Sequence, residues 1–130
     1  MINSERVVLV VEDDESIRNV IADVLEERGF RVQGAANGAE ALARLDTTRP
    51  DVMVLDLLMP VMHGWDFMEA YAEKTGGNRI PIVVVSVNPA LPRSFNHFGV
   101  RTVVAKPFDV DDLLNAVDEA LAATGSEATR

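Results

Sequence analysis

The chain has 130 residues and a formal net charge of -9, which fits one compact domain and argues against broad electrostatic binding to nucleic acid or an anionic membrane. It contains no cysteine, so disulfides, thiolate metal sites and cysteine nucleophiles are excluded. No apolar stretch approaches the ~18 residues of a membrane span and no signal peptide opens the sequence, so we expect a soluble, cytoplasmic protein.

Strand-like and helix-like stretches alternate along the chain, which predicts an α/β fold with a parallel sheet between layers of helices. The expected strands cover residues 6–11, 30–34, 51–56, 80–85 and 100–105. The expected helices cover residues 15–28, 38–45 and 109–123, and a further helix opens around 65–71. Apolar residues recur at spacings of three and four residues in the expected helices. Strand 51–56 is instead apolar on both faces, as a central strand should be.

Residues that start and stop helices mark the ends of these elements. Gly29 ends the first helix, and Asp109 or its acidic neighbours can cap the last one. Residues 124–130 are small and polar and are expected to fray. With no repeat or linker, we expect a single domain over residues 1–130, with a core near 6–123 and no output domain.

The segment between the fourth and fifth strands interrupts the regular alternation. Pro89 and Pro92 restrict the backbone where a helix is expected, because proline disfavours the helical conformation in the residue before it. We therefore expect a short or displaced helix that begins near Pro92 and closes at Gly99.

Four of the expected strands end at side chains that can handle phosphate or a metal ion. They are Glu12 and Asp13 after the first strand, Asp56 at the end of the third, Ser86 after the fourth and Lys106 after the fifth. In an open parallel sheet, ligands bind beyond the carboxyl ends of the strands. These residues are therefore expected to converge on one site.

The carboxylates of this set point to a divalent cation. Clustered carboxylates cannot all ionise at close range without a positive charge, and an all-oxygen set that keeps several waters favours Mg²⁺, which Mn²⁺ can replace. We expect Asp13 and Asp56 to bind the ion directly and Glu12 to act through a water molecule. A backbone carbonyl near Leu58 could complete the protein's share of the ligands.

The other polar residues fit phosphoryl transfer. An aspartate beside Mg²⁺ can accept a phosphoryl group as an acyl phosphate, so Asp56 is the candidate nucleophile. Lys106 offers a positive charge to one phosphoryl oxygen and Ser86 offers a hydroxyl donor to another, which is the electrostatic positioning that such a transfer needs.

From residue 7 to about 121, the chain resembles the receiver domain of two-component response regulators. The resemblance rests on four motifs in register, which are residues 10–15, residues 56–64, Ser86 and residues 106–108. It implies a doubly wound, flavodoxin-like (βα)5 fold whose five parallel strands have the order 2-1-3-4-5. It also implies a cis peptide bond between Lys106 and Pro107.

The resemblance assigns a role to each site residue. Asp56 would take a phosphoryl group from a histidine kinase or a phosphotransfer protein, with Mg²⁺ held by Glu12, Asp13 and Asp56. Lys106 would contact the acyl phosphate, and Ser86 would turn toward it to switch the distal face. The chain would then catalyse its own Mg²⁺-dependent phosphorylation and a slow dephosphorylation, without being a conventional enzyme.

Three departures from the family pattern concern signalling. Val103 stands where the family usually has an aromatic residue that reports phosphorylation, and Pro89 and Pro92 fall where receivers commonly have a regular helix. His63 replaces a common aspartate, and Leu58 puts an apolar side chain where the attacking water would approach. The first two departures lie on the face through which receivers normally contact partners.

Two further functions remain open at this point. A receiver-like interaction module could act largely independently of phosphorylation, as Val103 and the two prolines suggest. A Mg²⁺ phosphohydrolase is the weaker alternative, because such enzymes usually place an acid two residues after the nucleophile and Leu58 cannot serve. In the favoured interpretation the output is a downstream protein, which receives the phosphate or binds the chain directly.

Leu58 predicts that a phosphorylated chain loses its phosphate slowly. Replacing Leu58 with Asn should speed the loss, because an amide can orient the attacking water where the leucine side chain excludes it. The decay of the phosphorylated species, followed by intact mass after the phosphodonor is removed, measures this rate. A Leu58→Asn variant that decays no faster than the parent contradicts the prediction.

Overall fold

A computed structural model of the protein describes residues 6–56, 67, 69–71, 73, 80–86 and 100–128. The predictions about Leu58, His63, Pro89, Pro92 and Gly99 lie outside these residues. Within them, no helix is long and apolar enough to cross a membrane.

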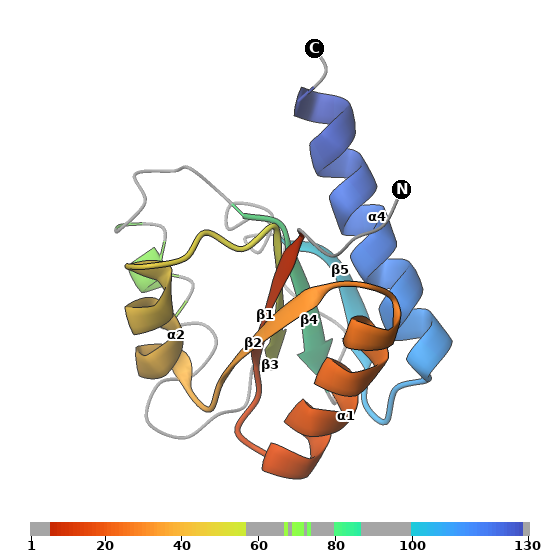
Figure 1. Ribbon diagram of the computed structural model, residues 1–130, viewed down its shortest axis with the longest axis horizontal. Coiled ribbons are helices and arrows are strands. Elements are labelled where there is room, and N and C mark those ends of the chain that lie inside the picture. Colours follow the sequence, from red (N-terminus) through yellow and green to blue (C-terminus); the bar gives the residue numbers. More distant parts are fainter. Residues whose placement is uncertain are drawn as a thin grey trace.

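Five parallel strands form one sheet in the order β2-β1-β3-β4-β5 (Figure 1). The strands are β1 (Val7–Val11), β2 (Arg31–Ala35), β3 (Val52–Asp56), β4 (Ile82–Ser86) and β5 (Val100–Ala105). The chain runs from β1 to the edge strand β2 and then crosses back to β3, from which β4 and β5 continue to the other edge. The doubly wound, flavodoxin-like order that was expected from the family resemblance is therefore confirmed.

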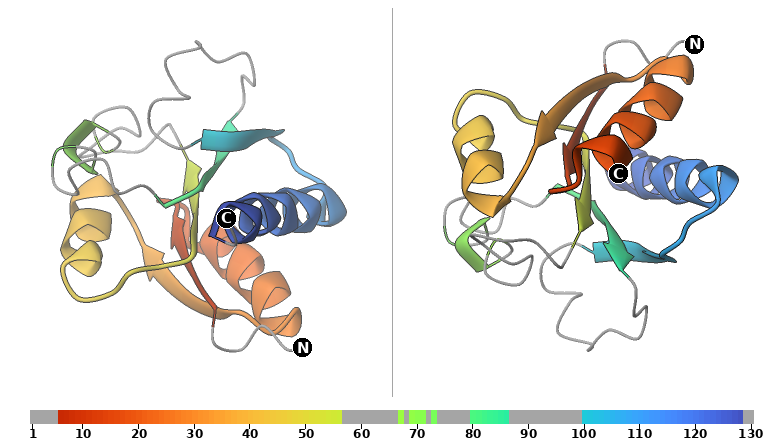
Figure 2. Two further views of the ribbon diagram at one scale, coloured as in Figure 1. Left: turned by 90° about the horizontal axis from the view of Figure 1, so that it is seen from above. Right: turned by 90° about the horizontal axis from the view of Figure 1, so that it is seen from below.

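Helices cover both faces of the sheet. They are α1 (Glu15–Glu27), α2 (Gly38–Leu45) and α4 (Val110–Ala128). Figures 1 and 2 show α1 and α4 side by side on one face and α2 on the other. Residues 67, 69–71 and 73 are also helical, and Phe67 and Tyr71 among them are buried. This confirms the helix expected to open near residue 65 at the positions that the structure describes.

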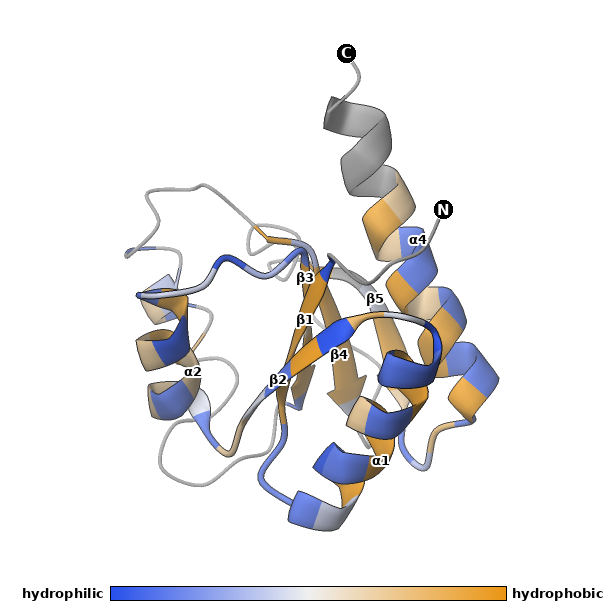
Figure 3. Ribbon diagram, in the orientation of Figure 1, coloured by the Kyte–Doolittle hydropathy of each residue, from blue (hydrophilic) through white to orange (hydrophobic). Residues whose placement is uncertain are grey.

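The alternation of side chains along the strands builds two hydrophobic layers. Val8, Val10 and Val54 face the layer that includes Leu25 of α1 and Leu113 of α4. Leu9, Val11, Met53, Leu55 and Val84 face the other layer, which includes Ala41 of α2 and the buried Phe67 and Tyr71. Figure 3 shows the result, with hydrophobic strands at the centre and hydrophilic positions on the helices. Polar functional groups are left to the ends of the strands.

Local capping fixes where the helices begin and end. The Asp14 side chain accepts a hydrogen bond from the Ile17 amide at 3.1 Å and so starts α1. Gly29, with φ 101°, adopts the left-handed conformation that ends this helix, as its place in the sequence predicted. Ahead of α4, the Asp109 side chain accepts from the Asp111 amide at 2.8 Å, which confirms the expected cap.

Several predicted boundaries differ from the structure, most of them by one or two residues, and two of the differences have a clear physical reason. The last helix does not end at Ala123 but continues to Ala128. Its alanines favour a helix, and one glycine costs only about 1 kcal/mol relative to alanine. β2 begins one residue later than expected, because the Phe30 amide donates to the Leu25 carbonyl and closes the end of α1.

Two neighbouring positions at the end of α1 should differ sharply in their effect on stability. Leu25 is fully buried, so Leu25→Ala should lower the free energy of unfolding by about 2–5 kcal/mol. Arg28 forms a 2.7 Å ion pair with Asp118 of α4, but both side chains are more than 40% exposed, at 41% and 45%. Arg28→Ala should therefore cost about 1 kcal/mol or less. Urea unfolding measures both values, and a comparable loss in the two variants contradicts this ranking.

Candidate functional site

The residues predicted from the strand ends meet at the carboxyl edge of the sheet. Glu12 directly follows β1, Asp56 and Ser86 end β3 and β4, and Lys106 directly follows β5. Glu12, Asp56 and Ser86 are 2%, 4% and 5% exposed, and they are the buried polar residues of the described part of the chain. Burial of polar groups is costly unless they are paired, so their concentration at one edge marks a site.

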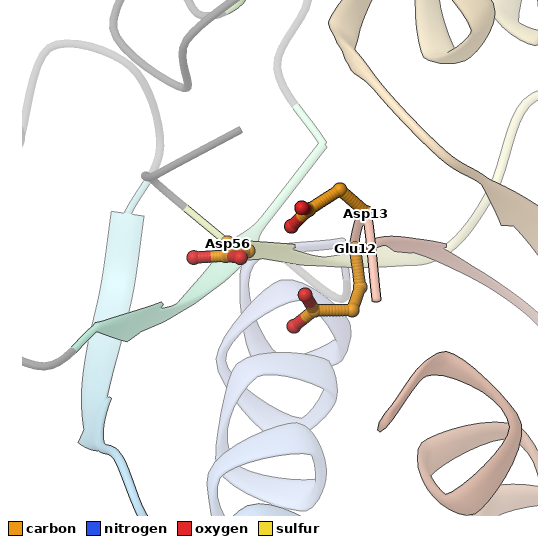
Figure 4. A group of neighbouring side chains, drawn as sticks. All are labelled: Glu12, Asp13 and Asp56. Atoms are coloured by element: carbon orange, nitrogen blue, oxygen red, sulfur yellow. The ribbon is translucent and has the colours of Figure 1, made fainter. Parts of the chain in front are cut away.

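Three carboxylates form an acidic cluster. Glu12, Asp13 and Asp56 each offer one carboxylate oxygen, and these oxygens lie within 4.8 Å of one another. Figure 4 shows the Glu12 and Asp13 side chains extending from the end of β1 toward the end of β3, where Asp56 lies. Glu12 and Asp56 are buried, whereas Asp13 is exposed. The cluster is therefore open to solvent on the Asp13 side.

Lys106 bridges the two buried carboxylates. Its Nζ donates to Glu12 Oε1 at 3.1 Å and to Asp56 Oδ2 at 3.2 Å. The Lys106 amide also donates to the Ser86 carbonyl at 2.9 Å, which holds the end of β5 against the end of β4. One ammonium thus neutralises part of the charge of three carboxylates.

The pKa values of the site reflect this shortage of positive charge. The pKa of the Glu12 carboxyl is raised from its ordinary 4.5 to about 7, chiefly by burial and in smaller part by the neighbouring Asp56. Hydrogen bonds from the Asp14 amide and from Lys106 oppose the rise. Burial alone would lower the pKa of Lys106, but its hydrogen bonds and charge interactions with Glu12 and Asp56 outweigh burial and raise that pKa. Both shifts indicate a site that would gain from an additional cation.

The donor set fits a small, hard divalent cation. All three candidate donors are carboxylate oxygens, and Mg²⁺ prefers oxygen ligands at about 2.1 Å, so oxygens that contact one ion directly lie about 3–4 Å apart. The separations in the cluster allow this with a small adjustment. The open side at Asp13 leaves room for the waters that Mg²⁺ retains. The Leu58 carbonyl, the fourth expected ligand, lies outside the described residues.

The residues expected to act in switching occupy three different settings. Ser86 is buried at the end of β4. Val103 of β5 is half-buried and packs against the core layer on the α2 face. The peptide bond between Lys106 and Pro107 is cis, as predicted.

Sequence reasoning missed Arg18 of α1. Its Nη1 donates to the Glu12 backbone carbonyl at 2.7 Å, so it touches the residue that begins the acidic cluster. The available signal was a charged residue one turn into an amphipathic helix, next to the apolar position Ile17. Such a position lies at the border of the buried face, where a long side chain can reach back to the sheet.

The crowding of carboxylates predicts that the site lowers the stability of the metal-free protein. Asp56→Asn removes one negative charge and leaves Lys106 paired with Glu12, so the free energy of unfolding in a chelator should rise by on the order of 1 kcal/mol. Urea unfolding measures this change, and Asp23→Asn on the exposed side of α1 is the control. A loss of stability in Asp56→Asn would show that the Lys106 contact outweighs the repulsion.

Comparison with protein families and known proteins agrees with this geometry. Residues 8–118 match the family model for the response regulator receiver domain. The chain is 30% identical over 114 residues to Sporulation initiation phosphotransferase F of Bacillus subtilis (strain 168), covering 88% of this chain and 92% of that protein. It is 34% identical over 124 residues to Transcriptional regulatory protein PrrA of Mycobacterium leprae (strain TN), covering 94% of this chain but 52% of the relative. The chain therefore spans about half the length of that relative.

Solved structures give the same result. The chemotaxis response regulator CheY4 of Vibrio cholerae superposes with a TM-score of 0.79 at 32% identity, over 89% of this chain and 98% of that chain. A CheY-like receiver domain protein of Methanospirillum hungatei JF-1 superposes with a TM-score of 0.83 at 26% identity, over 94% and 98%. The match in sequence, strand order and acidic edge leads to one conclusion: this chain belongs to the family of response regulator receiver domains.

Proposed function

We propose that Asp56 accepts a phosphoryl group from a histidine kinase or a phosphotransfer protein, in a reaction that depends on Mg²⁺. The observation that carries this proposal is the position of Asp56. It is a buried carboxylate at the end of the central strand β3, 3.2 Å from the Lys106 ammonium and within the acidic cluster. A nucleophile, a positive charge and candidate metal ligands are thus gathered at one place.

Three carboxylates of this chain would hold the metal ion. Asp13 and Asp56 would contact Mg²⁺ or Mn²⁺ directly, and Glu12 would act through a water molecule. When bound, the ion supplies positive charge that offsets the negative charge of the phosphoryl group. The Leu58 backbone carbonyl is proposed as a further ligand from the sequence alone.

The chain's own residues carry out the transfer. An Asp56 carboxylate oxygen attacks phosphorus, the bond from phosphorus to the donor's imidazole nitrogen breaks, and that nitrogen keeps the electron pair. Lys106 leaves its contact with Asp56 and binds a phosphoryl oxygen, while the Ser86 hydroxyl donates to another. The proximity of Lys106 to Asp56 before transfer supports this role, because only a small movement of Nζ is needed.

The output is proposed to be a contact with another protein in the cytoplasm. The net charge of -9 disfavours nucleic acid and anionic membranes as direct partners. The relative from Bacillus subtilis is named a phosphotransferase, and this name supports a role in passing the phosphoryl group onward. Direct binding of a downstream protein is the other form that the output could take.

One observation favours a second candidate function, an interaction module that acts largely independently of phosphorylation. Val103 is half-buried in β5, where it has no aromatic ring that could move between an inward and an outward position. A domain that lacks this switch can keep the acidic site yet present the same binding surface in both states.

Phosphorylation of Asp56 separates the two functions. Incubation with a small-molecule phosphodonor and Mg²⁺ should add one phosphoryl group to the parent chain, detected by intact mass. The addition should disappear in Asp56→Asn and in the presence of a chelator. Asp51→Asn, which directly precedes the same strand at its amino end, is the matched control and should be phosphorylated normally. If neither the small donor nor a cognate kinase modifies the parent, the interaction module is the better description.

A further inference from the structure

Arg18 lies one turn into α1 and makes a short contact with the start of the acidic cluster. Its Nη1 donates to the backbone carbonyl of Glu12 at 2.7 Å, and the side chain is partly buried. A charged donor on a neutral carbonyl at this distance is a charge-assisted hydrogen bond, which is stronger and more directional than a neutral one.

This contact completes a set of restraints on the Glu12 backbone. The last registered pairs of β1 with its neighbours are at Val11, so Glu12 lies one residue beyond the strand ladder. Its amide donates to the Ala35 carbonyl at 3.0 Å, which fixes one side of the residue. Arg18 fixes the other side, through the carbonyl. These two bonds hold the backbone from which the Glu12 carboxylate extends to Lys106 and to the Asp14 amide.

Gly34 of β2 leaves the space that the Arg18 side chain occupies. A Cβ atom built on Gly34 would lie 3.2 Å from Arg18 Cδ and 3.5 Å from Arg18 Nε. A larger side chain at residue 34 would therefore displace the stem of Arg18. The two residues come from different elements, α1 and β2, and together they bring the guanidinium to Glu12.

We propose that Arg18 is a positioning residue for the divalent-cation site, that it acts by fixing the Glu12 backbone, and that Gly34 is required because it leaves room for Arg18. This inference rests on the proposed function, in which Glu12 helps to hold Mg²⁺. Groups behind metal ligands typically change metal affinity by about 10- to 100-fold when they are removed, because the ligands must be held within a fraction of an ångström.

The loss of positive charge alone predicts the opposite change in Mg²⁺ affinity. Removing a positive charge near a cluster of three carboxylates should strengthen the binding of a cation if Arg18 acts only through its field. Positioning predicts weaker binding, because Glu12 loses the restraint on its carbonyl. The direction of the change in Mg²⁺ affinity therefore distinguishes the two effects.

The test measures Mg²⁺ binding to the metal-free protein by titration calorimetry in the parent and three variants. Arg18→Met removes the donor, and Gly34→Val keeps the arginine but fills its space, while valine suits a strand better than glycine. Arg28→Met is the matched control, because Arg28 directly follows α1 and makes a 2.7 Å hydrogen bond to Asp118, away from the acidic cluster, and its loss removes the same charge. The double variant Arg18→Met, Gly34→Val completes the set.

Positioning predicts that Arg18→Met and Gly34→Val each weaken Mg²⁺ binding about tenfold, that the double variant is no weaker than either, and that Arg28→Met binds as the parent does. Thermal unfolding without Mg²⁺ checks that each variant is folded. Unchanged or tighter binding in Arg18→Met, with normal binding by the parent, overturns the role of Arg18 and leaves the proposed function intact. If the parent itself binds no Mg²⁺, the proposed function and this inference both fail.

Discussion

A single ammonium shared by two buried carboxylates is the constraint around which the functional edge of the sheet is arranged. Lys106 contacts both Glu12 and Asp56, and all three groups come from the ends of different strands. Taking such charges out of water costs several kcal/mol for each ion unless they are paired. The sheet must therefore place the ends of β1, β3 and β5 together, and the strand order with β3 near the centre does this.

The two hydrophobic layers explain why the polar groups collect at one edge. Every position of β3 and β4 is buried, so neither face of these central strands has room for a charged side chain. Only the strand ends are free of this constraint. There, three carboxylates face one lysine, so their negative charge is not fully neutralised. A bound cation would supply the missing positive charge, so the proposed metal binding would also stabilise the fold.

Helix α1 joins the acidic edge to the body of the domain. The Asp14 amide donates to Glu12 Oε2 at 3.2 Å, while the Asp14 side chain caps the helix. The Arg18 amide donates to the Asp14 carbonyl at 2.8 Å, and its side chain returns to Glu12. The first turn of the helix is thus built around the first carboxylate of the site. The residues that start α1 are also the ones that orient Glu12.

The sequence alone determined the alternation of strands and helices, the ends at Gly29 and Asp109, and the residue types at the strand ends, because these depend on periodicity and local backbone preference. The strand order needed a family resemblance in addition. Only the tertiary structure decided that Lys106 pairs with Glu12, 94 positions away along the chain, that Arg18 holds the Glu12 carbonyl beside Gly34, and that the last helix reaches Ala128. The two side-chain contacts join residues of different elements, so no pattern within a single element reveals them. The extension of the last helix past Gly125 runs against local preference, because glycine disfavours a helix interior by about 1 kcal/mol relative to alanine.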